Sequence, residues 1–354
     1  MIKDKLSLTD IATEVKYLQI DNSRPIQQIS NIKKSDTTLF IQTSKGVFTY
    51  NTKGKFLNEI GKKGKGPKEY TAAYDIEINR QKEYVYLLGS KTVYVYSFDG
   101  KFVNSFPTFN KMHFDKIIYK DSKLYFPVAF KIGDKHDYQW VITDETGHLL
   151  SAKTNPANDV QIRAALKINC CFEENNRLCY WNQLNDTIFY IDNKNGQLAY
   201  LFSNDKYRIT ESDIALAENI RNKSFWNLIS VFATSKYLLF EYINILEKTR
   251  IYAVYDKNSK KRYLLNSTEF GKESDKYNAW DNGLCFMPGS KWSEKTESWF
   301  VDWIDAYQLK AHVASEAFKN STPKYPEKKK ELKQLANSLD ENDNPILMLV
   351  KLKE

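Results

Sequence analysis

A repeat with a period of 46 residues limits the possible fold more than any other feature of this sequence. The segments Gly46–Ile60 and Thr92–Phe106 are identical at six of fifteen positions. Each segment alternates apolar or aromatic residues, passes through a glycine and returns as a second alternating run. The pattern predicts a β-hairpin with a tight turn, because glycine accepts the positive φ that such a turn requires.

The turn position recurs along most of the chain. Glycines stand at this position with spacings of 46, 47 and 49 residues, namely Gly54, Gly100, Gly147 and Gly196. A fifth copy is expected at 251–260, where Ser259 or Lys260 replaces the glycine. The chain therefore contains at least five hairpins of one kind.

Two segments depart from the simple repeat. A sixth, degenerate copy is expected at 283–287 together with 298–304. The longer interval before the fifth copy contains 210–220, which we predict to be an inserted helix with Thr210 as its N-cap.

The length of the repeat predicts a propeller. If about 25 residues at the N-terminus and about 44 at the C-terminus are set aside, six copies of about 48 residues remain, and a four-stranded blade needs about 40–50. The strands are apolar on both faces, for example at Val93 and Val95 on one face and at Tyr94 and Tyr96 on the other. Blades that lie between two neighbours require such strands. A β-sandwich or jelly roll does not explain the period.

We therefore predict an all-β fold, a six-bladed β-propeller with a short helical C-terminal extension. Residues 1–305 are expected to form the propeller, and residues 306–354 a helical tail and final strand that pack on it. The last copy is short of strands. We expect 15–20 to add the missing strand, which closes the ring and leaves no exposed edge.

The C-terminal extension has its own pattern. Residues 306–320 and 327–339 are predicted to be helices, separated by a break at Pro323 and Pro326. Residues 344–350 are predicted to be the final strand.

The charge is basic but rests on lysine. The chain has 52 Lys and Arg against 44 Asp and Glu, and only 8 of the 52 are arginines. Arginine is the usual residue for bidentate recognition of phosphates and bases, so this balance indicates solvated lysine faces and argues against a nucleic-acid partner. No apolar run approaches the ~20 residues of a membrane span.

Cysteine and histidine do not form a metal-binding pattern. The four cysteines include no C-x-x-C pair and the four histidines are scattered, so we expect neither a metal site nor a cofactor. The cysteines are expected to be small buried residues, with a Cys171–Cys179 bridge across a hairpin as the alternative.

One loop invites comparison with phosphate-binding motifs. The run 61–67 has the glycine spacing of a P-loop, but Pro67 stands where the lysine should be. The run is therefore expected to be a connection between blades. The functional alternative is an anion-attracting rim formed by Lys62, Lys63 and Lys65 together with backbone N–H groups, with Tyr70 beside them.

Three tryptophans fall near expected loops. Exposed rings of Trp226, Trp280 and Trp292 could stack on sugars or other flat ligands. The alternative is packing between blades. No Gly-x-Ser-x-Gly motif is present, and the pairing of carboxylates such as Asp75 and Glu77 cannot be read from the sequence, so no catalytic residue is assigned.

Residues 60–70, 74–78 and 93–102 resemble the NHL-type blade consensus. With 281–288 and 335–347, they are more closely similar to a bacterial six-bladed β-propeller family found as envelope lipoproteins. The resemblance extends from about residue 13 to 353. It implies a propeller fold and a location in the cell envelope, but no common activity.

Two departures from that family are visible. The chain begins without the lipoprotein signal peptide and anchoring cysteine of the family, so we interpret it as a mature or truncated form or as one with a misassigned start. NHL-type blades also often carry an aspartate near the end of the second strand. The matching run 87–92 has no acid, which argues against a channel metal site like that of NHL-fold enzymes.

The leading hypothesis is a non-catalytic binding propeller of the bacterial cell envelope, recognising a glycan, a peptide or an envelope protein. The alternative is a propeller enzyme, a lyase or hydrolase, acting at the mouth of the central channel. An NHL-like RNA binder is a third possibility, which the scarcity of arginine disfavours.

Overall fold

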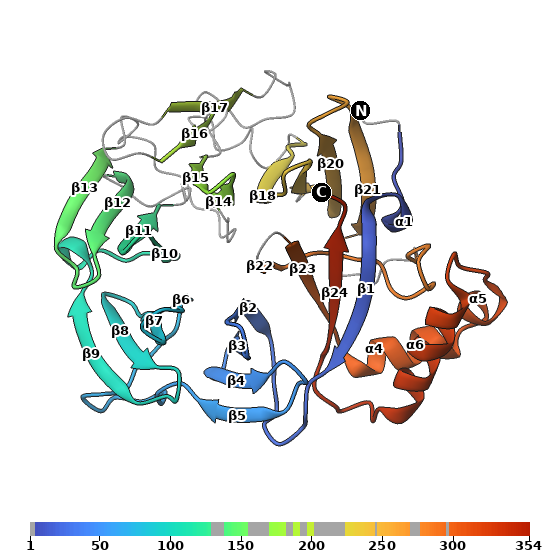
Figure 1. The fold of residues 1–354 in the computed structure, drawn as a ribbon, viewed down its shortest axis with the longest axis horizontal. Coiled ribbons are helices and arrows are strands. Elements are labelled where there is room, and N and C mark those ends of the chain that lie inside the picture. The colour runs from blue at the N-terminus through green and yellow to red at the C-terminus, as the bar shows by residue number, and fades with distance from the viewer. Residues whose placement is uncertain are drawn as a thin grey trace. The chain divides into compact units, whose positions relative to one another are not determined.

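The computed structural model describes residues 4–128, 138–154, 170–181, 187–191, 197–201, 224–244, 246–269, 277–294 and 297–354. Their strands form six four-stranded antiparallel sheets, and the fold is a six-bladed β-propeller, as predicted (Figure 1). The predicted helix at 210–220 and the turn at Gly196 lie outside the described residues.

By its internal contacts the chain divides into two compact units. The first comprises residues 1–89, 94–104 and 273–354, and the second 90–93 and 105–272. Strands β8 and β9 have residues in both units.

The first unit holds the sheet β2-β3-β4-β5 and the sheet β1-β24-β23-β22, with β6 and β7. The strands are β1 (Ala12–Gln19), β2 (Ile29–Lys34), β3 (Thr38–Thr43), β4 (Val47–Asn51), β5 (Phe56–Glu59), β6 (Asp75–Asn79), β7 (Tyr84–Leu88), β8 (Thr92–Ser97), β9 (Phe102–Pro107), β22 (Ser290–Glu294), β23 (Glu297–Ile304) and β24 (Ile346–Leu352). The helices are α1 (Leu8–Ile11), α4 (Ala306–Ala314), α5 (Glu316–Asn320) and α6 (Pro326–Ser338).

The second unit holds the sheets β10-β11-β12-β13, β14-β15-β16-β17 and β18-β19-β20-β21. Their strands are β10 (Ile118–Lys120), β11 (Lys123–Pro127), β12 (Tyr138–Asp144), β13 (Leu149–Thr154), β14 (Cys171–Glu174), β15 (Arg177–Tyr180), β16 (Thr187–Tyr190), β17 (Gln197–Leu201), β18 (Asn227–Ala233), β19 (Tyr237–Asn244), β20 (Thr249–Asp256) and β21 (Arg262–Glu269). A 3-10 turn, η1, spans Phe109–Lys111.

Apolar residues on both faces of the strands build the core of the first unit. On one face of the first sheet, Ile41 and Tyr50 pack with Trp299 and Leu347 of the last sheet. On its other face, Phe40 and Val47 join a second cluster with residues of β6 and β7. The sheet β2-β3-β4-β5 therefore buries both surfaces, which explains why its strands lack a polar face.

The last sheet joins the two ends of the chain. Strand β1 pairs antiparallel with β24, from Ala12 opposite Leu352 to Gln19 opposite Ile346. Strand β24 in turn pairs with β23, so β1 is the outer strand of this sheet. The division of the chain at residue 305 stays a prediction.

The sixth copy of the repeat differs from its predicted course. Residues 283–287 do not form a strand; Leu284 makes only an isolated bridge with Tyr277, and β22 begins at Ser290. The carboxylate of Asp302 accepts a hydrogen bond from the backbone N–H of Met287 (2.8 Å), and Pro288, which follows, has no N–H to offer a ladder.

The turn glycines have the conformation that the repeat predicts. Gly54, Gly100 and Gly147 have φ of +80°, +84° and +92°. In the fifth copy Lys260 takes this position with φ of +59°. A Cβ added to Gly100 would lie 2.3 Å from the carbonyl oxygen of Glu59, so glycine also permits a close approach between neighbouring sheets.

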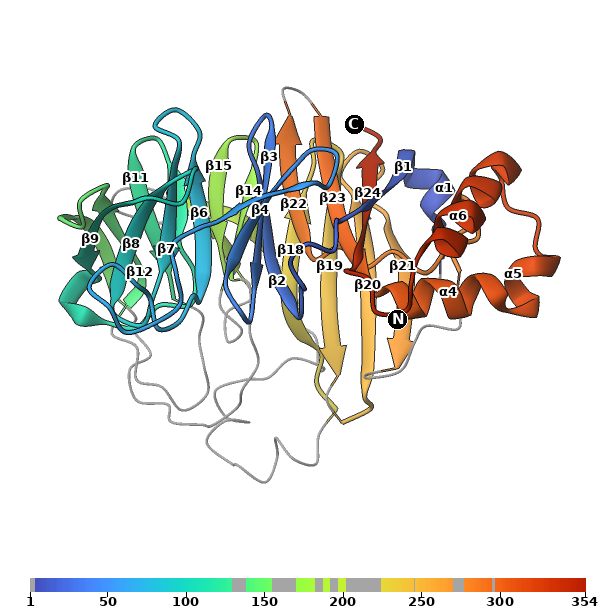
Figure 2. The ribbon, with the colours of Figure 1, turned by 90° about the horizontal axis from the view of Figure 1, so that it is seen from below.

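The C-terminal helices lie beside the last sheet. Figure 2 shows α4, α5 and α6 beyond β1 and β24, on the side away from β2. The segment predicted as one helix over 306–320 is divided at Ser315, whose side chain accepts a hydrogen bond from the N–H of Phe318 (3.1 Å) and caps α5. Within the described residues, no helix is both long and apolar enough to cross a membrane.

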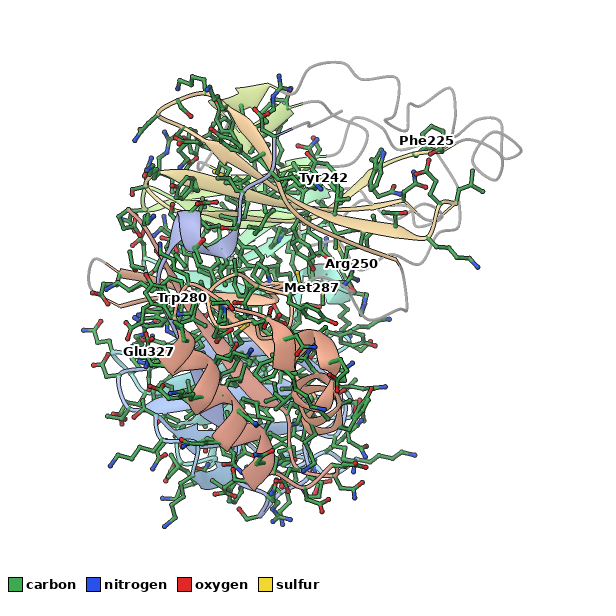
Figure 3. The ribbon with its side chains drawn as sticks, turned by 90° about the vertical axis from the view of Figure 1, so that its right-hand side faces the viewer. Phe225, Tyr242, Arg250, Trp280, Met287 and Glu327 are labelled. Atoms are coloured by element: carbon green, nitrogen blue, oxygen red, sulfur yellow. The ribbon has the colours of Figure 1, made fainter. Side chains whose placement is uncertain are left out.

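The loop at 277–284 anchors these helices. The ring of Trp280 packs on Tyr325, the residue before α6, with centroids 4.4 Å apart (Figure 3 labels Trp280, and Glu327 in the first turn of α6). His312 Nε2 lies 2.6 Å from the carbonyl oxygen of Asn282, so this nitrogen carries the donated proton.

Candidate functional site

The lysine-rich segment is the connection between β5 and β6. Its backbone is fixed by hydrogen bonds within the loop: Tyr70 N–H to Lys62 O (3.1 Å) and Gly64 N–H to Tyr70 O (3.0 Å). The hydroxyl of Tyr96 donates to the carbonyl oxygen of Lys68 (2.9 Å). These bonds hold the loop in one conformation over the sheet.

The loop uses some of its backbone donors internally. The Glu69 carboxylate accepts a hydrogen bond from the N–H of Gly66 (2.8 Å) and would contact any Cβ placed on Gly64. The N–H groups of Gly64 and Gly66 are therefore not offered to a ligand. Any anion binding here has to depend chiefly on the lysine side chains.

The lysine side chains themselves are exposed. Lys62, Lys63, Lys65 and Lys68 point to solvent from the loop, and the ammonium group of Lys63 reaches the carbonyl oxygen of Ser44 (3.0 Å). This contact brings the turn between β3 and β4, with its exposed Lys45, next to the loop. We call Lys45, Lys62, Lys63, Lys65 and Lys68 the lysine face.

Tyr70 lies beneath this surface. Its ring is fully buried and packs against Tyr94 and Tyr96, at centroid distances of 6.5 and 6.3 Å. Burial raises the pKa of its hydroxyl to about 12. In this conformation Tyr70 supports the loop from below.

The three candidate tryptophans occupy different surroundings. Trp226 is half-buried just before β18, in the second unit. Trp280 is buried against Tyr325, and Trp292 is buried in β22, opposite Trp299 in the register. The rings of Trp280 and Trp292 would have to leave these contacts before they could stack on a ligand.

The innermost strands of the first unit carry a polar network whose pairing was not assigned from the sequence. Asn31 Nδ2 donates to Asp75 Oδ1 (2.7 Å), and the Lys33 ammonium group forms an ion pair with Glu77 Oε2 (2.6 Å). Both pairs join β2 to β6 over 44 residues. Both pairs are separated by the same number of residues, which is close to the repeat period. This spacing is the sequence signal that could have revealed the two pairs.

The second unit holds a related contact and a more deeply buried one. Lys120 of β10 donates to Glu173 Oε1 of β14 (2.8 Å). The neighbouring Glu174 has a fully buried side chain and forms an ion pair with Lys257, which also donates to Thr234 O (2.6 Å). These charged groups link adjacent sheets of this unit.

The alternative of a Cys171–Cys179 bridge is wrong, because these two cysteines are not bridged to each other. Cys170, Cys171 and Cys179 are buried as expected, whereas Cys285 is half-buried. Burial raises the pKa of Cys170 and of Cys179 to about 12, which makes both thiols poor nucleophiles. The described residues hold no group of three or more His, Cys, Asp or Glu side chains suited to a metal ion.

The order of the strands in six sheets defines a six-bladed β-propeller, and the connection between β5 and β6 gives it an exposed lysine face. The chain belongs to the family described as Domain of unknown function (DUF4934), whose model matches residues 2–351. No curated protein sequence matches the chain.

Comparison with solved structures matches the chain to bacterial and fungal proteins. A "putative exported protein" from Bacteroides fragilis is 17% identical with a TM-score of 0.72, over 100% of this chain and 99% of that one. The Pan2 WD40 domain of Neurospora crassa is 12% identical with a TM-score of 0.43, over 85% and 81%. A protein of unknown function from Bacteroides caccae is 12% identical with a TM-score of 0.42, over 67% and 81%.

Proposed function

We propose that the protein is a non-catalytic β-propeller of the bacterial cell envelope that binds a glycan, a peptide or an envelope protein. Support for the location comes from the similarity to an exported-type protein of Bacteroides fragilis and from the family resemblance in the sequence. We also propose that the protein is of the envelope-lipoprotein type and that its blades are NHL-like, as the family resemblance in the sequence implies.

The observation that carries the binding function is the lysine face. Lys62, Lys63 and Lys65 are exposed on a loop whose backbone is already held by its own hydrogen bonds. A ligand that binds such a preorganised loop does not have to order its backbone, so more of the interaction energy appears as affinity. We assign ligand contact to these three lysines and support of the loop to Tyr70. Trp226 is a separate candidate in the second unit.

The network on the inner strands favours binding over catalysis. Asp75 and Glu77 are the carboxylates of β6, and they are engaged by Asn31 and Lys33. A general acid or base has to exchange protons with a substrate, whereas these groups hold two sheets together. We therefore assign them a structural role.

The test is a binding screen that also detects turnover. The purified chain is incubated with arrays of glycans and peptides and with envelope extracts. Each bound ligand is recovered, and its mass is measured by mass spectrometry. Recovery of an unchanged ligand supports the proposal. A ligand that is cleaved or eliminated would establish the enzyme alternative, and a screen with no bound ligand of any class would refute the binding function.

A further inference from the structure

We propose that the lysine face binds an acidic polysaccharide through its sulfate or carboxylate groups. This inference rests on the proposed binding function and names the ligand class of the same site. It follows from the sign of the exposed charges, from the use of the backbone donors and from the arrangement of the lysines in two adjacent segments.

The fully exposed charged groups of this surface are lysines, and the acids beside them, Glu59 and Glu69, are half-buried. The acid of the loop, Glu69, turns toward the backbone, where its carboxylate accepts the N–H of Gly66. Lys62, Lys65 and Lys68 remain exposed around it. The negative charge of the loop is thus used to hold its shape, while its positive charges face outward, which attracts polyanions.

The surface lacks the geometry of a phosphate cradle. Such a cradle depends on several backbone N–H groups that converge on one anion. In this loop the N–H of Gly64 is bonded to Tyr70 O, and that of Gly66 to Glu69. Lysine acts as a point charge on a flexible stem, so lysines alone suit a ligand with many separate charges rather than one phosphate.

The cations extend over two segments. Because Lys63 reaches the carbonyl oxygen of Ser44, Lys45 on the turn between β3 and β4 continues the surface of the loop. A group of cations that comes from two neighbouring segments suits a polymer with charges repeated along its length. Of the two aromatic residues of the loop, Tyr74 is half-buried and Tyr70 is fully buried, so stacking on the Tyr70 ring does not contribute to recognition of a neutral sugar.

The experiment compares two charge reversals of equal size. K62E/K65E changes the lysine face, and K330E/K333E changes two exposed lysines of α6. Both alter the net charge by the same amount. Binding of the full chain to heparin, polygalacturonate, neutral dextran and a 30-nucleotide RNA is measured by biolayer interferometry between 50 and 300 mM NaCl, with circular dichroism as the control for folding. Over this range of salt concentration the screening of charges between protein and ligand changes strongly.

The wild type is expected to bind heparin or polygalacturonate, not dextran, with affinity that falls as salt rises. K62E/K65E should weaken binding about tenfold or more and lower the slope of log affinity against log salt by about 2, while K330E/K333E leaves both nearly unchanged. Equal losses in both variants, or tighter binding to RNA than to either polysaccharide, would overturn the inference.

Failure of the inference can be told apart from failure of the proposed function. In one outcome, the wild type and K62E/K65E both bind the same ligand from the screen without changing it, and neither binds an acidic polysaccharide. The proposed ligand class is then wrong, while the proposed binding function stands. If the wild type binds nothing in either experiment, both are wrong.

Discussion

The side chain of Asn344 joins the end of the chain to its beginning. Its Oδ1 accepts a hydrogen bond from the backbone N–H of Ile26 (2.7 Å), and its Nδ2 donates to the carbonyl oxygens of Asp21 and Arg24 (2.7 Å each). The side chain is buried and fully used. One amide thereby organises the loop that leads from β1 to β2.

Replacing Asn344 by alanine is expected to destabilise the protein by about 2–4 kcal/mol. The substitution leaves one buried N–H and two part-buried carbonyl groups without their partner, and each such group costs up to about 1–3 kcal/mol when it finds no water. Urea unfolding measures the change. Asn342→Ala, two residues earlier and exposed, is the control and should change stability by less than about 0.5 kcal/mol. Equal effects of the two substitutions would contradict the role of Asn344.

Gly100→Ala is expected to cost about 2–4 kcal/mol, because an alanine would be strained at φ of +84° and its Cβ would collide with Glu59 O. In the fifth copy the reverse change is informative. Lys260 has φ of +59°, so Lys260→Gly should raise the free energy of unfolding by up to about 1 kcal/mol. Thermal unfolding of both variants tests whether Gly100→Ala lowers the stability and Lys260→Gly raises it. A loss of stability in Lys260→Gly would show that the contacts of the lysine side chain outweigh the strain of its backbone.

The neighbours Glu173 and Glu174 should behave very differently. The Glu174 side chain is fully buried beside Lys257, whereas that of Glu173 is 53% exposed. Glu174→Ala leaves the ammonium group of Lys257 without its counter-charge and should cost about 3–5 kcal/mol. Glu173→Ala should cost at most about 1 kcal/mol. Guanidinium unfolding compares the two, and a small effect at Glu174 would mean that Lys257 finds water or another anion.

Asp281 should make stability depend on pH. Burial raises the pKa of its carboxyl above the usual value of 3.8. A carboxyl whose pKa is raised on folding holds its proton more tightly in the folded than in the unfolded protein. Its contribution to the free energy of unfolding is therefore present at low pH and is lost as the pH rises through the folded-state pKa. Asp281→Asn cannot ionise. The variant should therefore gain stability relative to the wild type between pH 4 and pH 7, as urea midpoints at each pH would show; a constant difference would contradict the raised pKa.

Local patterns were enough to predict the blades. The spacing of Gly54, Gly100 and Gly147 follows from hairpins of similar length, and the positive φ at these residues is a property of the turn itself. The start of α6 at Pro326 is equally local, because proline suits the first turn of a helix and disrupts one that arrives from before it.

The candidate site was accessible to sequence reasoning only in part. That Lys62, Lys63 and Lys65 are exposed follows from the charge of lysine. The burial of Trp280 and Trp292 does not follow from the sequence, because it depends on which element covers each ring: Tyr325 of the C-terminal segment covers one, and Trp299 of the neighbouring strand pairs with the other.

The sequence by itself determined the repeat, the six-bladed fold that its length implies and the turns at Gly54, Gly100 and Gly147, because each of these hairpins depends on residues close together in the chain. Only the tertiary structure decided that Asn344 bonds to Ile26, that Lys33 pairs with Glu77 and that Glu69 fills the loop below the lysine face. Side-chain hydrogen bonds and ion pairs act over about 3 Å, and which groups come that close depends on how the strands and loops pack.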